Sequence, residues 1–68
     1  MDERVIKRGD LVKWFLAYDV GLVKDAGYGI VVSVFENSYY GETYNTYRVY
    51  RNEHEDIMIF EKSEIEII

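Results

Sequence analysis

Few residues in this sequence could do chemistry, and the first of them is His54. It is the single histidine, and it lies in the acidic run Glu53-His54-Glu55-Asp56. One imidazole with neighbouring carboxylates is a ligand set that zinc or manganese accepts. However, consecutive residues rarely converge on one ion, and there is neither a second histidine nor a cysteine. We therefore expect a solvated acidic turn between two strands, with no metal site and no cofactor.

Catalysis also lacks its usual residues. Ser33 and Ser63 have no histidine close to them in sequence, and the absence of cysteine removes the thiolate nucleophiles. Glu64 and Glu66 would flank the last expected strand and point to solvent. A small barrel is filled by its own side chains and leaves no room for a substrate. The sequence therefore predicts a protein that is not an enzyme.

The tyrosines are the residues that point most directly to a function. Three of the seven lie together in a segment that joins two expected strands: Tyr39, Tyr40 and Tyr44. Tyrosine is favoured at binding surfaces because its large ring loses little conformational entropy and ends in a polar hydroxyl. Trp14 and Tyr28 join this candidate partner-binding set if their edges reach the surface. Local packing of the same rings over one end of the domain is the alternative, and both interpretations stay open.

The length and composition fit one small folded domain. A chain of 68 residues with 49% hydrophobic and 16% aromatic residues is too apolar for disorder, and without cysteine it has no disulfides. We divide it into a short N-terminal lead, residues 1–8, and a single domain, residues 9–68. No run approaches the roughly 18 apolar residues of a membrane helix. The start does not resemble a signal peptide either, so we expect a soluble, cytoplasmic protein without membrane contact.

The charge is −5 and is unevenly spread. Residues 1–24 hold five basic and four acidic residues, whereas residues 25–68 hold three basic and nine acidic ones. An acidic surface repels phosphate, so binding to nucleic acid is not expected. The acidic half could instead imitate phosphates and occupy a host protein's nucleic-acid groove, although ordinary solubility accounts for a charge of this size. The carboxylates for such mimicry would be Glu53, Glu55, Asp56, Glu61, Glu64 and Glu66.

The elements that must position these residues are strands. Five runs rich in β-branched and aromatic residues predict strands over 11–18, 29–35, 44–51, 56–60 and 65–68. A long connection over 19–28 and a single 3-10 turn near 61–64 complete the pattern. Alternation predicts these inward side chains: Val12, Trp14, Leu16, Ile30, Val32, Val34, Tyr47, Val49, Ile57, Ile59, Ile65 and Ile67. A bulge near Gly29 would shift that register. With Val32 inward, Val32→Asp would bury a lone charge and leave no folded protein.

Three segments carry a family resemblance. Residues 7–14 (KRGDLVKW) resemble the start of SH3-like barrels, and residues 27–34 (GYGIVVSV) resemble their second strand, with a Gly-x-Val pattern also seen in KOW-type domains. Residues 61–68 (EKSEIEII) are similar to the closing turn and strand. Together they resemble the small SH3-like barrel protein of photosystem I and short SH3-like proteins encoded by phages. The resemblance implies an all-β, five-stranded SH3-like barrel with a single 3-10 turn before the last strand.

The function implied by this resemblance is a non-catalytic protein-interaction module. It would be a phage accessory or virion-associated protein, located in the host cytoplasm or in the virion. The alternatives are a nucleic-acid-associated KOW-type domain and an acidic, nucleic-acid-mimicking inhibitor of a host protein. Either a protein partner or self-association as a homo-oligomer is expected, because a small domain gains stability by associating. The tyrosine segment is the predicted contact.

Overall fold

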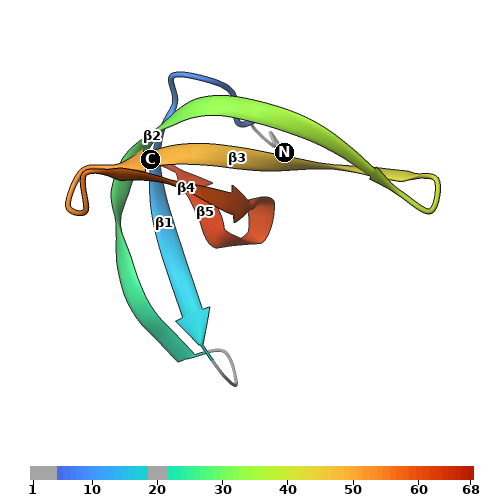
Figure 1. The fold of residues 1–68 in the computed structure, drawn as a ribbon. Coiled ribbons are helices and arrows are strands. Elements are labelled where there is room, and N and C mark those ends of the chain that lie inside the picture. The colour runs from blue at the N-terminus through green and yellow to red at the C-terminus, as the bar shows by residue number, and fades with distance from the viewer. Residues whose placement is uncertain (1–4, 19–21) are drawn as a thin grey trace.

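The computed structural model describes residues 5–18 and 22–68, with the side chains of residues 5–16 and 25–68. Five antiparallel strands form one open sheet in the order β4-β3-β2-β1-β5 (Figure 1). The elements are β1 (Leu11–Tyr18), β2 (Leu22–Tyr39), β3 (Glu42–Arg51), β4 (Asp56–Glu61), the 3-10 turn η1 (Lys62–Glu64) and β5 (Ile65–Ile67). The all-β class and the single turn before the last strand are confirmed. Within the described ranges, no helix has the length and apolar character needed to cross a membrane.

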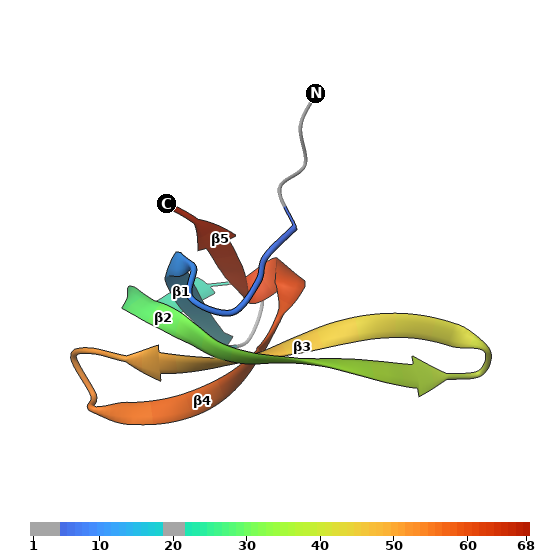
Figure 2. The ribbon, with the colours of Figure 1, turned by 90° about the horizontal axis from the view of Figure 1, so that it is seen from above.

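Strand β2 is much longer than predicted. It has 18 residues and begins at Leu22, so most of the long connection expected over residues 19–28 is strand; residues 19–21 lie outside the described part. Its first part pairs with β1 and its second part with β3, and the ribbon curves between the two (Figures 1 and 2). Gly27 and Gly29 are strand residues at which another part of the chain comes close to the backbone. A Cβ on Gly27 would lie 2.7 Å from the Trp14 ring, and one on Gly29 would meet the carbonyl oxygen of Tyr50.

A β-bulge at Val32 separates the part of β2 that was predicted wrongly, Ile30 and Val32, from Val34, which packs against the core as predicted. Val31 pairs with Val49 and Ser33 with Arg48, so Val32 is the extra residue. Val31 is fully buried, whereas Val32 is 37% exposed and Ile30 is similarly exposed. The prediction that Ile30 and Val32 face the core is therefore wrong. The strand is apolar on both faces here, so alternation could not reveal which face is buried, and one extra residue flips every side chain beyond it.

The face of β4 was also predicted wrongly. Ile57 and Ile59 are each 57% exposed, and the inward side chains are Met58 and Phe60. Phe60 stacks on Trp14 with the ring centroids 5.8 Å apart. Residues 57–60 are all apolar, so no alternation of polar and apolar residues indicates which face is buried. The large Phe60 ring fills the space beside Trp14, and this sets the inward face.

The core lies on the concave side of the sheet. Its buried side chains are Ile6, Val12, Trp14, Val31, Tyr47, Val49, Phe60 and Ile65, with Leu16, Val34, Met58 and Ile67 packed around them. Of the predicted inward set, Val12, Trp14, Tyr47, Val49 and Ile65 are buried. Ile6, from the segment assigned to the N-terminal lead, also belongs to the core. The opposite, convex side of the sheet is left without a covering layer among the described residues.

Candidate functional site: the outer face of the sheet

A row of apolar side chains crosses four adjacent strands on the convex side. Leu11 in β1 lies opposite Ile30 in β2, Ile30 lies opposite Tyr50 in β3, and Tyr50 lies opposite Ile57 in β4. Residues that face each other in an antiparallel pair project to the same side of the sheet. Leu11 and Ile57 are more than half exposed, at 54% and 57%. The row is therefore a continuous apolar strip open to solvent.

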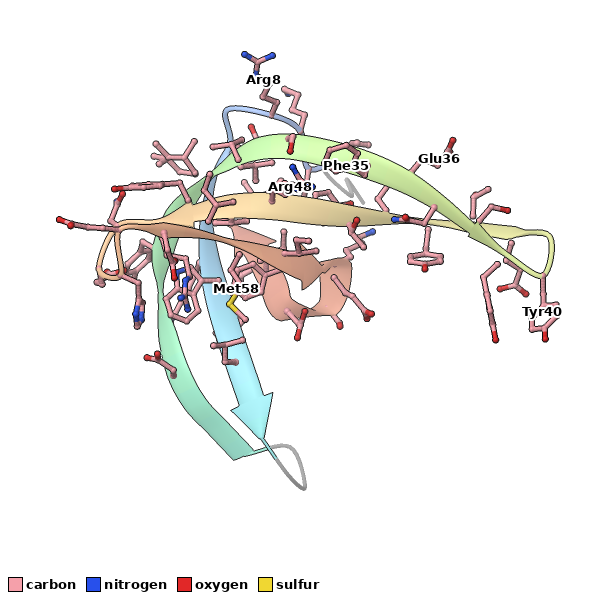
Figure 3. All side chains as sticks on the ribbon, viewed as in Figure 1. Arg8, Phe35, Glu36, Tyr40, Arg48 and Met58 are labelled. Atoms are coloured by element: carbon pink, nitrogen blue, oxygen red, sulfur yellow. The ribbon has the colours of Figure 1, made fainter. Side chains whose placement is uncertain are left out.

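Cations and aromatic rings flank this strip. The Arg48 guanidinium lies 4.6 Å from the centroid of the Phe35 ring, and Ile59 lies opposite Arg48 in the neighbouring strand. Figure 3 places Phe35 and Arg48 on one side of the sheet and Met58 on the other. On β1, the Lys13 Nζ lies 5.5 Å from the Phe15 ring. We call the whole surface the outer face: Leu11, Lys13, Phe15, Tyr28, Ile30, Phe35, Arg48, Tyr50, Ile57 and Ile59.

The composition of the outer face suits contact with another protein. Isoleucine, leucine and aromatic rings supply apolar area, while the Arg48 and Lys13 cations lie over the Phe35 and Phe15 rings. Contiguous exposed apolar patches usually mark interaction sites, and aromatic residues and arginine are enriched among those that carry binding energy. Because the residues stand on paired strands, their positions are fixed before any partner arrives.

The predicted tyrosine segment is the tip of a long hairpin rather than a loop. Tyr40 and Gly41 form the two-residue turn, with φ values of 51° and 81°. Two positive φ values are typical of the type I′ turn, whose twist matches that of the flanking strands. The Tyr39 and Tyr40 rings meet edge to face with centroids 4.4 Å apart, and Tyr40 is 89% exposed. The tip projects beyond the rest of the sheet (Figure 2), so these two rings contact each other and not the core.

The structure does not bring the five predicted contact residues together. Trp14 is fully buried, and its Nε1 donates a hydrogen bond to the Tyr28 carbonyl oxygen at 3.3 Å. Its edge does not reach the surface, so Trp14 is a core residue and cannot contact a partner in this fold. Tyr28 is half-exposed on the outer face, opposite Lys13. Tyr44 lies near the tip, half-exposed and opposite Asn37 in the hairpin.

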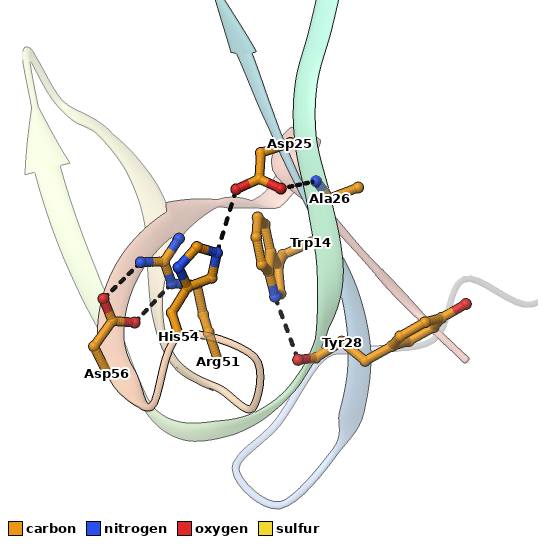
Figure 4. Close-up of polar contacts among 7 residues, drawn as sticks. All are labelled: Trp14, Asp25, Ala26, Tyr28, Arg51, His54 and Asp56. Carbon is orange, nitrogen blue, oxygen red and sulfur yellow. Dashed lines mark hydrogen bonds and ion pairs between the residues drawn. The ribbon is translucent and has the colours of Figure 1, made fainter.

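A polar cluster covers Trp14 at one end of the sheet (Figure 4). Arg51 is buried, its guanidinium lies 5.0 Å from the Trp14 ring, and its Nε and Nη2 donate to the two Asp56 oxygens at 2.7 and 2.6 Å. The hydrogen bonds and charge of Arg51 lower the pKa of Asp56 below its ordinary value, with a smaller contribution from His54. This bidentate pair fastens β3 to β4.

The acidic run around His54 is held by internal contacts. The His54 Nε2 lies 3.2 Å from an Asp25 carboxylate oxygen, and its ring lies 5.6 Å from that of Trp14. Among the described side chains, no three metal-binding groups come together around one point. Of the carboxylates considered for phosphate mimicry, Asp56 is paired with Arg51, and Glu64 accepts a hydrogen bond from the Glu61 backbone N–H at 2.8 Å. These two carboxylates therefore have partners within the chain.

A groove of about 620 Å³ opens on the concave side, between the N-terminal segment, β3 and η1. Its lining residues are Val5, Ile6, Tyr44, Asn45, Tyr47, Glu61, Lys62 and Ser63. Ser63 is the only one with an aliphatic hydroxyl, and His54, the single imidazole of the chain, does not line it.

The sequence prediction missed the outer face as a surface. The signal was present in two runs that are apolar at consecutive positions, residues 30–32 and 57–60. A strand that is apolar on both faces needs cover on both faces, and a chain of this size has only one layer to offer. Comparison of the chain with protein-family models, with curated proteins and with solved structures gave no match in any of the three.

Proposed function

We propose that the chain is a non-catalytic protein-interaction module on an SH3-like barrel, of the phage accessory or virion-associated kind that the sequence resembles. The strand order supports this topology, since β1 lies between β5 and β2, and one long curved strand is shared between β1 and β3. The 3-10 turn directly before β5 agrees with the same pattern. The phage setting rests on the resemblance alone.

The observation that carries the interaction role is the apolar row Leu11, Ile30, Tyr50 and Ile57. Four strands each contribute one side chain to it, so the row spans most of the width of the sheet. Burying this strip against an apolar partner surface removes it from water, which contributes a favourable free energy of roughly 25 cal/mol per Å² of apolar area. The partner is therefore a protein with a complementary apolar patch, in which acidic groups would meet Arg48 and Lys13.

The tyrosine tip is a second, separate contact within the same proposal. Tyr39 and Tyr40 are well exposed, and their rings are already in edge-to-face contact, so a partner that binds this aromatic pair would order few further side-chain conformations. It stands at the end of an extended hairpin, four positions beyond Phe35, the outer-face residue nearest to it in β2. A partner that needs both contacts must be large enough to span them.

Affinity capture with matched variants tests which surface binds. Wild-type protein, Ile30→Lys on the outer face and Tyr40→Ser at the tip are used to capture proteins from a lysate of host cells, and the affinity of each captured protein is then measured. Both substituted residues are exposed, so both variants should fold. We expect Ile30→Lys to lose the partner and Tyr40→Ser to weaken it. A partner that is retained equally by all three proteins would contradict both contacts.

A further inference from the structure

Strand β4 is an open edge of the sheet. Its residues Asp56–Glu61 pair with β3 on one side, and no described strand pairs with it on the other. Apart from the Glu61 N–H, which donates to the Glu64 carboxylate, the backbone N–H and C=O groups that point away from β3 are thus available to a further strand. Such an edge is a template for pairing with another chain unless something protects it.

The usual protections are missing from β4. It contains no lysine, no proline and no register shift, and its four central residues are all apolar. Its charges, Asp56 and Glu61, stand only at the two ends. The opposite edge differs, because β5 has three residues and carries Glu66 at its centre. The described sheet therefore has one long, apolar edge and one short edge.

We propose that two copies of this chain pair antiparallel through β4, with Met58 opposite Met58 of the second copy. The two sheets then join into one of ten strands, five from each copy. The symmetry is a two-fold axis through the centre of β4, so each residue contact occurs twice.

The register follows from the exposed isoleucines. Residues that face each other must lie on the same side of the joined sheet, so Ile57 and Ile59 oppose outward residues only. With Met58 at the axis, Ile57 of each copy faces Ile59 of the other, and all four exposed isoleucines pair. A shift that puts Ile59 on the axis leaves Ile57 opposite Glu61, and a shift that puts Ile57 there leaves Ile59 opposite Glu55. Only the first register covers every exposed apolar side chain of β4.

The occupant of the edge is a second copy because β4–β4 pairing uses the long edge of both chains, so the assembly ends at a dimer. After β4 meets β4, the outermost strands of the joined sheet are the two short β5 strands, which are poor templates. Pairing of β4 with β5 would instead be head-to-tail and would propagate into filaments. A domain of this size also has marginal stability of its own, and association adds to it. Edge pairing leaves the outer-face residues of β1, β2 and β3 uncovered, so the dimer and the partner contact can fail independently.

Cross-linking reads the register directly, because the native chain has no cysteine. Ile57→Cys and Ile59→Cys are exposed substitutions, and one of the two proteins carries an affinity tag that makes the mixed dimer heavier. Opposed residues in an antiparallel pair have Cα atoms about 4.5–5.5 Å apart, within disulfide range. We expect the mixture to form the mixed disulfide and each protein alone to cross-link slowly. Fast self-cross-linking of either variant, or none in the mixture, would overturn the register.

Sedimentation of a matched pair of variants tests the edge itself. Wild-type protein should sediment at twice the 8.1 kDa of the chain and dissociate on dilution. Ile59→Lys puts a protecting charge on the edge and should give a monomer. Leu11→Lys is the control, since Leu11 is equally exposed on the same face but stands on β1, and it should remain a dimer. A wild-type monomer, or a dimer lost in Leu11→Lys and kept in Ile59→Lys, would refute edge pairing.

Discussion

Val31 and Val32 are adjacent valines with different burial, and replacing each with alanine tests the register of β2. Val31 is fully buried against the core, whereas Val32 is the extra residue of the bulge on the outer side. The backbone hydrogen bonds of Val31 with Gly9 and Asp10 do not depend on its side chain. Any difference between the two variants therefore reports side-chain burial.

The magnitude follows from the groups removed. Valine to alanine deletes two methyl groups, each worth about 0.8 kcal/mol when buried. With the cavity left beside packed neighbours, Val31→Ala should cost about 2–3 kcal/mol. Val32→Ala should cost about 0.5–1 kcal/mol, as expected for a part-exposed position. A domain of this length has a free energy of unfolding of about 3–10 kcal/mol, so the first loss is a large share of the total.

Urea unfolding followed by tryptophan fluorescence measures both losses, with buried Trp14 as the single tryptophan. At a slope of about 1 kcal/mol per molar urea, the Val31→Ala midpoint should drop by about 2–3 M and that of Val32→Ala by less than about 1 M. The same logic predicts that Val32→Asp folds while Val31→Asp does not. Equal losses, or a larger loss at Val32, would refute the bulge and restore the register expected from alternation.

Three further outcomes follow from particular contacts. Arg51 lowers the folded-state pKa of Asp56, so the stability from this pair is complete above the unfolded-state pKa of about 3.9 and is lost as the pH falls below that value. Asp56→Asn should therefore lack this acid-dependent part of the stability when denaturation is measured as a function of pH. Gly29→Ala should abolish the folded circular dichroism signal, since its Cβ would meet the Tyr50 carbonyl oxygen, and a folded variant would contradict the strand pairing. The chain should show no salt-sensitive retention on DNA or RNA columns, and retention that weakens with added salt would instead favour the nucleic-acid alternative.

The sequence was informative wherever one face of a strand was polar or crowded by a special residue. In β1, Lys13 between Val12 and Trp14 marks the outward face, and the predicted inward pair is buried. The same pattern holds in the last strand, where Glu66 between Ile65 and Ile67 marks the outward face and so identifies the two isoleucines as inward. The strands and their inward faces could therefore be predicted in these places from alternation alone.

The rest could not be predicted because the deciding facts are not local. The phase of residues 30–34 depends on one bulged residue, and that of residues 57–60 on the space beside Trp14 that Phe60 fills. The hairpin tip was expected as a loop, although Tyr40-Gly41 is a two-residue turn. The outer face appears only when the pairing of four strands is known, since its members are scattered from Leu11 to Ile59 along the chain.

Site-specific photo-cross-linking tests the interaction surface most directly. A photoreactive amino acid replaces either Ile30 at the centre of the outer face or Lys62 in η1 on the concave side, and the protein is irradiated in host-cell lysate. Both positions are solvent-accessible, so both variants report on what surrounds the folded domain. A partner protein cross-linked at position 30 and absent at position 62 is the result we expect. Cross-linking at position 62 with none at position 30 would contradict the outer face as the binding surface.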